Sequence, residues 1–203
     1  MHRLFVLLAS MTALSSLPSL ASAQVGGSRI HIGAGFALDV GGEVDFDLPR
    51  DPDLDATIGL RGHLDYAVHR YVSVGGLVRM SWWKPDYDPY RFEVDRSFLL
   101  DLGPRVIGHY DWREFRFYGG ISPGLTISAI DSDADLIDNP AAGFTLSLTV
   151  AGAEWWFSRR AGLFLELGWV GHWFEHDGEG LTPGELDVEL SQMMMEFGFV
   201  FGV

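Results

Sequence analysis

Charged residues stand at alternate positions within several apolar stretches, a spacing that suits ion pairs. Arg79 and Arg105 have apolar residues on both sides, and so do Glu166 and Glu196. Side chains alternate between the two faces of a β-strand, so each charge shares one face with small or polar residues. An enclosed charge is costly unless it is paired. The sequence therefore predicts an interior network of ion pairs, with these members: Arg61, Arg79, Asp101, Arg105, Glu154, Glu166 and Glu196.

Two other clusters have residue types that bind metal ions or transfer protons. The segment 131–135 (DSDAD) is spaced like the start of a calcium loop, but Leu136 and Ala142 stand where that loop needs Gly and Glu. The segment 172–176 (HWFEH) could form an acid–base or metal cluster, yet no serine or cysteine partner is evident for its histidines. We therefore predict no catalytic residue, no metal site and no cofactor.

The charges lie in eight segments where apolar residues alternate with small or polar ones, the period-two pattern of β-strands. In the C-terminal segment 193–203 (MMMEFGFVFGV), residues such as Phe197 share one face and Glu196 lies on the other. Eleven such residues can cross a bilayer at a tilt of about 45°. The predicted strands are residues 29–47, 56–68, 71–83, 96–110, 115–129, 142–157, 162–174 and 186–203.

Two positions predict departures from regular strand pairing. Pro104 lacks the N–H that a ladder hydrogen bond needs, so it predicts an irregularity such as a bulge in strand 96–110. In strand 142–157 the alternation must shift near Gly152, because Glu154 would otherwise lie on the apolar face.

Long and short connections alternate along the chain, as in outer-membrane barrels with short periplasmic turns and longer external loops. Aromatic residues gather at the strand ends, and their amphipathic rings favour the two membrane interfaces. The predicted members of these aromatic girdles are Trp82, Trp83, Trp112, Trp155, Trp156 and Trp173.

These patterns predict an all-β fold, an eight-stranded antiparallel up-and-down transmembrane β-barrel. Such a barrel has a lumen just wide enough for side chains to fill. We therefore expect the charges to plug it, with a loosely hydrated channel as the alternative. A soluble secreted carrier barrel shows the same alternation with its apolar face inside, so it remains a second interpretation.

The N-terminus has the features of a secretory signal peptide. Arg3 precedes an apolar run over residues 4–14, and Ala21-Ser22-Ala23 forms a cleavage site before Gln24. We therefore divide the chain into a signal peptide, 1–23, and one barrel domain, 24–203. The formal net charge of −14 argues against binding to nucleic acid. The chain has no cysteine, which excludes disulfides and thiolate metal sites.

The run 151–169 (AGAEWWFSRRAGLFLELGW) resembles the strand–turn–strand signature of the OmpA/OmpX-type small outer-membrane barrels. This resemblance implies that Glu154 and Glu166 point into the lumen, and that Phe164 stands where a lumenal arginine is common. The C-terminal strand is similar to the one that the barrel-assembly machinery of that family recognises. The family usually ends in Phe or Trp, whereas this chain ends in Val203.

The resemblance implies a non-enzymatic protein of the outer membrane of a Gram-negative bacterium, with a structural or surface-interaction role. The expected partners are outer-membrane lipid, lipopolysaccharide and the barrel-assembly machinery, and we expect a monomer. Two functional alternatives remain at this point: a narrow pore for small solutes and a lipid A-modifying enzyme.

Overall fold

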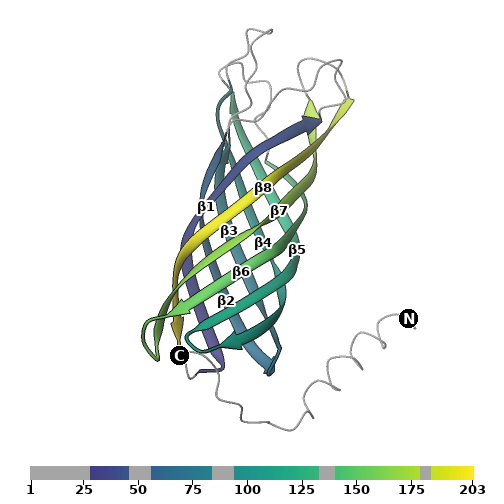
Figure 1. Ribbon diagram of the computed structural model, residues 1–203. Helices are drawn as coiled ribbons and strands as arrows, with labels where there is room; N and C mark the ends of the chain where they lie inside the picture. The colour runs from purple at the N-terminus through teal and green to yellow at the C-terminus, as the bar shows by residue number, and fades with distance from the viewer. Residues whose placement is uncertain (1–27, 46–55, 84–93, 133–139, 179–183) are drawn as a thin grey trace, which may run out of the picture.

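The chain closes into a barrel of eight antiparallel strands, each paired with its neighbours in sequence, with β8 returning to β1 (Figure 1). The computed structural model describes residues 28–45, 56–83, 94–132, 140–178 and 184–203. The strands are β1 (Ile30–Asp45), β2 (Thr57–His69), β3 (Val72–Trp83), β4 (Val94–Trp112), β5 (Phe115–Ser132), β6 (Ala141–Trp156), β7 (Ala161–Gly178) and β8 (Gly184–Gly202). The predicted fold class is confirmed. The predicted signal peptide lies outside the described residues.

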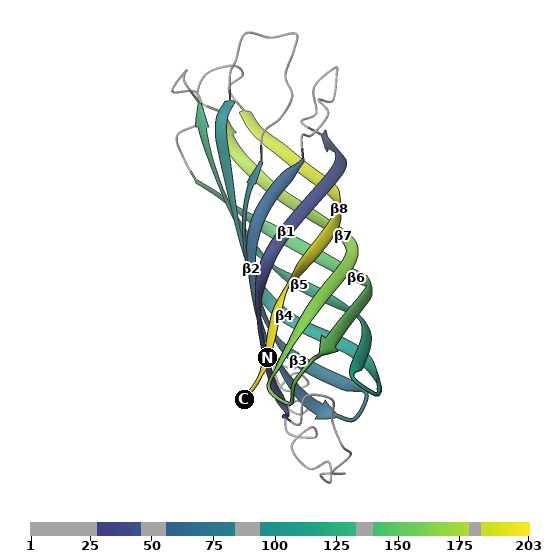
Figure 2. The same cartoon turned by 60° about the vertical axis from the view of Figure 1, so that its left-hand side comes forward.

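The strands wind around the barrel axis at an incline, and the C-terminus lies at one end with the β2–β3, β4–β5 and β6–β7 turns (Figures 1 and 2). We call this the short-turn end. At the opposite end, β4 and β7 extend beyond the predicted 96–110 and 162–174. The sequence missed these extensions because polar residues there interrupt the apolar alternation. Among the residues that the structure describes, no helix is long and apolar enough to cross a membrane.

The outward side chains form an apolar wall between the two ends of the barrel. On β7, Leu163, Leu165 and Leu167 are exposed, and on β8 Phe197 and Phe199 are exposed. The lumenal side of the same strands is buried and carries the charges. The barrel therefore has the inverted arrangement, apolar outside and charged inside, that distinguishes a membrane barrel from a soluble carrier barrel.

The phase shift predicted in β6 is present, slightly before Gly152. A register shift lies between Thr149 and Ala151 in the pairing with β7. Val150 and Ala151 are both exposed, whereas Thr149 and Gly152 are both buried. The extra residue returns Glu154 to the lumen, where it is 1% exposed.

The irregularity predicted at Pro104 is present as an interruption of the β4–β5 pairing between Leu102 and Val106, and it is not a bulge. The β4–β5 pairs Leu102↔Leu125 and Val106↔Ile121 have the same register, so no residue is inserted between them. This register sets Pro104 opposite Pro123, and neither proline can donate an N–H. Both strands therefore lack ladder bonds at the same level, and they need no extra residue to stay aligned.

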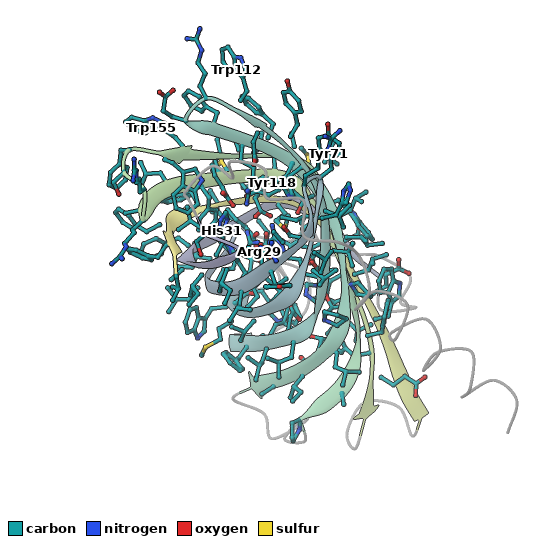
Figure 3. All side chains as sticks on the ribbon, turned by 90° about the horizontal axis from the view of Figure 1, so that it is seen from below. Arg29, His31, Tyr71, Trp112, Tyr118 and Trp155 are labelled. Carbon is teal, nitrogen blue, oxygen red and sulfur yellow. The ribbon has the colours of Figure 1, made fainter. Side chains whose placement is uncertain are left out.

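The predicted aromatic girdles need a correction at two of their six members. Trp82, Trp112 and Trp155 face outward and are exposed, and Trp173 is partly exposed. Trp112 and Trp155 stand at the outer edge of the short-turn end (Figure 3). Trp83 and Trp156 instead point into the barrel and are 3% and 4% exposed. Each follows an outward tryptophan, and adjacent strand residues face opposite sides.

Candidate functional site

The lumen is built around Glu166 of β7, which is completely buried and accepts hydrogen bonds from four side chains. Arg61 and Arg105 each donate to Oε1, at 2.8 Å and 2.7 Å. The Tyr118 hydroxyl also donates to Oε1, at 2.7 Å, and the Thr149 hydroxyl to Oε2, at 2.9 Å. The donors come from β2, β4, β5 and β6, so this one carboxylate of β7 connects five of the eight strands.

Arg61 bridges two carboxylates that would otherwise repel each other. Glu166 and Glu196 are direct cross-strand partners on β7 and β8. Like charges placed opposite each other destabilise a sheet. The guanidinium of Arg61 donates from Nη2 to Glu166 and from Nη1 to Glu196, so both carboxylates share one cation. The planar fork of arginine suits such double recognition.

The arginines form a matching pair on the other side of the lumen. Arg61 and Arg79 are direct cross-strand partners on β2 and β3. Arg79 donates to Asp39 of β1 and lies 3.8 Å from Glu196. Two pairs of like charges therefore face each other across the lumen and are neutralised there rather than within their own hairpins. We call Arg61, Arg79, Arg105, Glu166 and Glu196 the central cluster.

A second ionic group lies nearer the short-turn end. Arg116 and Glu154 are cross-strand partners, with 3.8 Å between Nη1 and Oε2. The same carboxylate lies 3.4 Å from His31 and accepts a 2.8 Å hydrogen bond from the indole of Trp156. Arg116 also donates to Asp111 at 2.7 Å. Trp156, which faces inward, thus serves as a hydrogen-bond donor within the lumen.

Phe164 fills the place where the resemblance to OmpA/OmpX-type barrels implies a lumenal arginine. Its ring lies 5.2 Å from the Arg61 guanidinium carbon and 5.1 Å from the His63 ring. Together with Trp156 and Val200 it forms a small apolar core. The Phe164 ring therefore fills part of the lumen on the short-turn side of the central cluster and makes a cation–π contact with Arg61.

The half of the lumen farther from the short turns contains fewer charges. His172 lies 3.0 Å from Asp101, and Thr57 and Gln192 bond to each other. Beyond them lies an apolar cluster, which consists of Trp83, Leu99, Ala141, Phe174, Val188 and Leu190. This end of the interior is thus packed like a protein core.

All seven predicted network residues lie in the lumen and are at most 4% exposed. Five of them form the connected ion pairs of the central cluster: Arg61, Arg79, Arg105, Glu166 and Glu196. In the pair Arg105–Glu166, Nη2 lies 2.7 Å from Oε1. Glu154 lies apart from these five and contacts His31, whereas Asp101 is the cross-strand partner of Arg79 and lies 3.0 Å from His172. The contributions of Tyr118 and Thr149 were missed, although both have the alternation of a lumenal side chain.

Of the other two candidate clusters, the structure describes side chains only in part of the segment 172–176. His172 faces the lumen and Glu175 faces outward, so the segment 172–176 does not bring them together. The side chain of His176 lies outside the described residues, as do those of 131–135. In the part of the chain that the structure describes, no three His, Asp or Glu side chains are grouped to hold a metal ion.

The barrel belongs to the fold class of the small eight-stranded outer-membrane β-barrels. The structure of the outer membrane protein OprG from Pseudomonas aeruginosa matches with a TM-score of 0.63 and 14% identity, over 88% of this chain and 98% of OprG. Neisserial surface protein A (NspA) matches with a TM-score of 0.53 and 13% identity, over 87% and 98% of the two chains. No protein-family model and no curated protein sequence matches the chain. At these identities the likeness establishes the fold.

Proposed function

We propose that the chain is a non-enzymatic integral outer-membrane barrel whose lumen is closed by ion pairs, with a structural or surface-interaction role. The observation that carries the proposal is the contrast between an apolar wall and a lumen that contains four buried arginines: Arg61, Arg79, Arg105 and Arg116. Lipid can cover such a wall, whereas water could not do so without a large hydrophobic penalty. In this proposal the signal peptide directs export and the C-terminal strand engages the barrel-assembly machinery.

The same contrast argues against a soluble carrier. A carrier of apolar ligands needs an apolar interior, but the centre of this barrel is occupied by Glu166 and its four donors. Outer-membrane lipid and lipopolysaccharide are therefore the partners that fit the wall, and the proposed protein acts as a monomer.

A closed lumen follows from how completely the central cluster fills it. Arg61 and Arg105 each lie within hydrogen-bond distance of Glu166, and Arg61, Arg105 and Glu196 are each at most 4% exposed. To let an ion pass, these side chains would have to separate, and separating a buried pair is strongly unfavourable.

A narrow pore is the second candidate, and one observation favours it. Buried polar atoms such as Asp39 Oδ1, Arg79 Nη1 and Asp101 Oδ1 have no protein hydrogen-bond partner. Buried polar atoms almost always bond to protein or water, so these positions favour water inside the lumen.

Two measurements test the proposal in sequence. A heat-modifiable band on SDS gels of the detergent-extracted outer membrane is expected, and recovery in the soluble periplasmic fraction would reject the membrane assignment. Planar-bilayer recordings then separate plug from pore. We expect no steady conductance from the wild type and small openings from the variant R105S/E166S. Steady wild-type conductance that R105S/E166S leaves unchanged would reject the plug.

A further inference from the structure

Arginines surround the short-turn end, although the chain as a whole is acidic. Five of them are exposed there, and we call them the arginine rim: Arg29, Arg70, Arg113, Arg159 and Arg160. Glu114 is the exposed acid at this end among the described residues, and Asp111 is ion-paired with Arg116. The formal net charge of the chain is −14, so the rim is a local reversal of the overall charge.

Three of these arginines lie on two neighbouring turns. The N–H of Trp156, at the end of β6, donates to the carbonyl of Glu114 at 2.8 Å. The β4–β5 turn with Arg113 is therefore adjacent to the β6–β7 turn with Arg159 and Arg160. Together they concentrate positive charge on one side of the barrel mouth.

Arg113 is the first residue of the two-residue turn between β4 and β5. Its φ is 55°, in the left-handed region that costs an ordinary residue energy and that Gly or Asn usually occupies. Its guanidinium carbon lies 5.2 Å from the centroid of the Trp112 ring. Two-residue hairpin turns require a positive φ at this position, so the turn accounts for the backbone angle, and the contact with Trp112 places the guanidinium beside an outward-facing indole.

An aromatic row borders the same arginines on the outer wall. Trp112 pairs with Phe115 across β4 and β5, and Phe115 pairs with Trp155 across β5 and β6. Trp155 continues the row to Phe157, with ring centroids 6.0 Å apart. Trp112 and Trp155 are 49% and 47% exposed, and both project from the barrel edge in Figure 3. Above the row, exposed Phe117 and Leu163 continue the apolar wall.

We propose that Arg113, Arg159 and Arg160, with the Trp112–Phe115–Trp155 row, bind the head group of an anionic phospholipid in the periplasmic leaflet. The inference rests on the proposed membrane function, and it names a lipid class and its position. Guanidinium groups bind phosphate oxygens through paired hydrogen bonds. Interfacial indoles lie at head-group depth, and the acyl chains run along the apolar wall.

The position of the site favours a lipid over a periplasmic protein or peptidoglycan. The arginines stand directly beside wall residues that the bilayer covers, so a bound phosphate lies at the membrane surface with its chains already in contact with the wall. A partner restricted to the aqueous periplasm would leave Trp112 and Trp155 without a function in binding.

Native mass spectrometry of the protein purified from outer membranes tests the site. The probes are phosphatidylglycerol and phosphatidylethanolamine with identical acyl chains, added in equal amounts. We expect the wild type to retain phosphatidylglycerol preferentially. R159Q/R160Q removes charge-assisted hydrogen bonds to the lipid phosphate, so it is expected to lower the apparent affinity for phosphatidylglycerol by at least about tenfold. The control R29Q/R70Q removes the same charge from other positions of the arginine rim and is expected to retain most of the preference.

Two outcomes would overturn the proposal. Equal losses in R159Q/R160Q and R29Q/R70Q would mean that the rim attracts lipid only diffusely. Absence of a preference for phosphatidylglycerol in the wild type would also reject the proposal, and Arg159-dependent binding to isolated peptidoglycan would then assign the patch to the cell wall. Failure of the proposed membrane function is seen separately, because the protein would then be absent from the outer-membrane fraction before any lipid is added.

Discussion

The two faces of β7 differ in how strictly their side chains must match surrounding groups: the wall faces lipid, and the lumen faces side chains of other strands. Leu165 faces outward and is 45% exposed, whereas Glu166, the next residue, is fully buried and bonded to four side chains. Many apolar side chains satisfy the first position, because lipid adapts to their shape. At the second position, charge, length and direction must all match partners from four other strands.

The comparison teaches where the specificity of this fold resides. In a soluble protein the closely packed core is apolar and the solvated face is permissive. Here the apolar face is the permissive one, because lipid tails are as apolar as leucine and distinguish poorly between apolar side chains. The polar interior takes over the role of a core. We therefore expect substitutions in the lumen to be costly even when they conserve shape.

The largest effect is expected from Glu166→Gln. The variant keeps the shape of the side chain and removes the charge shared by Arg61 and Arg105, and losing one partner of a buried pair costs about 3–5 kcal/mol. The measurement is urea unfolding of the protein folded in lipid vesicles, followed by gel mobility. The matched wall variant Leu165→Met is expected to cost less than about 1.5 kcal/mol. Similar losses for the two variants would contradict the comparison.

A charge placed on the wall is expected to have the next largest effect. Val106 is 44% exposed and lies between the aromatic pair Trp82–Phe98 and Trp112 at the short-turn end. Val106→Arg should cost about 2–4 kcal/mol at mid-bilayer depth. The control Tyr110→Arg lies nearer the interface, where about 0–1 kcal/mol is expected. The urea midpoints of unfolding of the two variants, measured in the same vesicle assay, check this prediction. A larger loss of stability in Tyr110→Arg than in Val106→Arg would refute the mid-bilayer depth of Val106.

A smaller loss is expected where an inward glycine makes room for a ring. A Cβ at Gly152 would come within 2.3 Å of the Tyr118 ring, whose hydroxyl donates to Glu166. Gly152→Val should therefore displace the ring and cost about 1–3 kcal/mol, the usual range for overpacking. Ala153→Val adds bulk to the outward neighbour and should have little effect. Thermal unfolding followed by circular dichroism compares the two variants. A greater loss of stability in Ala153→Val than in Gly152→Val would contradict the prediction.

The smallest effect is expected at the adjacent tryptophans of β6. Trp156→Phe removes the indole donor to Glu154 and should cost about 0.5–1.5 kcal/mol, whereas Trp155→Phe should cost less. Quenching by lipids with brominated acyl chains gives an independent readout. Most quenching should be retained in Trp156→Phe and part of it lost in Trp155→Phe. The opposite result would place Trp156 on the wall and restore it to the aromatic girdle.

Much of this barrel could be predicted from local patterns. The alternation of apolar and polar residues depends only on the strand period, so it defined the eight strands and assigned residues such as Arg105 and Glu166 to one face. The shift in β6 was also predictable, because a buried carboxylate and an unbroken alternation were incompatible. The ends of the strands were predicted less accurately, because the alternation of apolar and polar residues is lost where both faces carry polar residues.

Only the closed barrel decided which charges meet. Local sequence does not encode the strand tilt and register that bring Arg61 between Glu166 and Glu196, or that set Pro104 opposite Pro123 without a bulge. Local sequence also left open which face of the strands lies inside the barrel. In the structure, the size of the side chains that the narrow lumen can hold determines this. Glycines such as Gly152 leave room in a narrow lumen for long charged and aromatic side chains, and most of the bulky apolar residues lie on the wall.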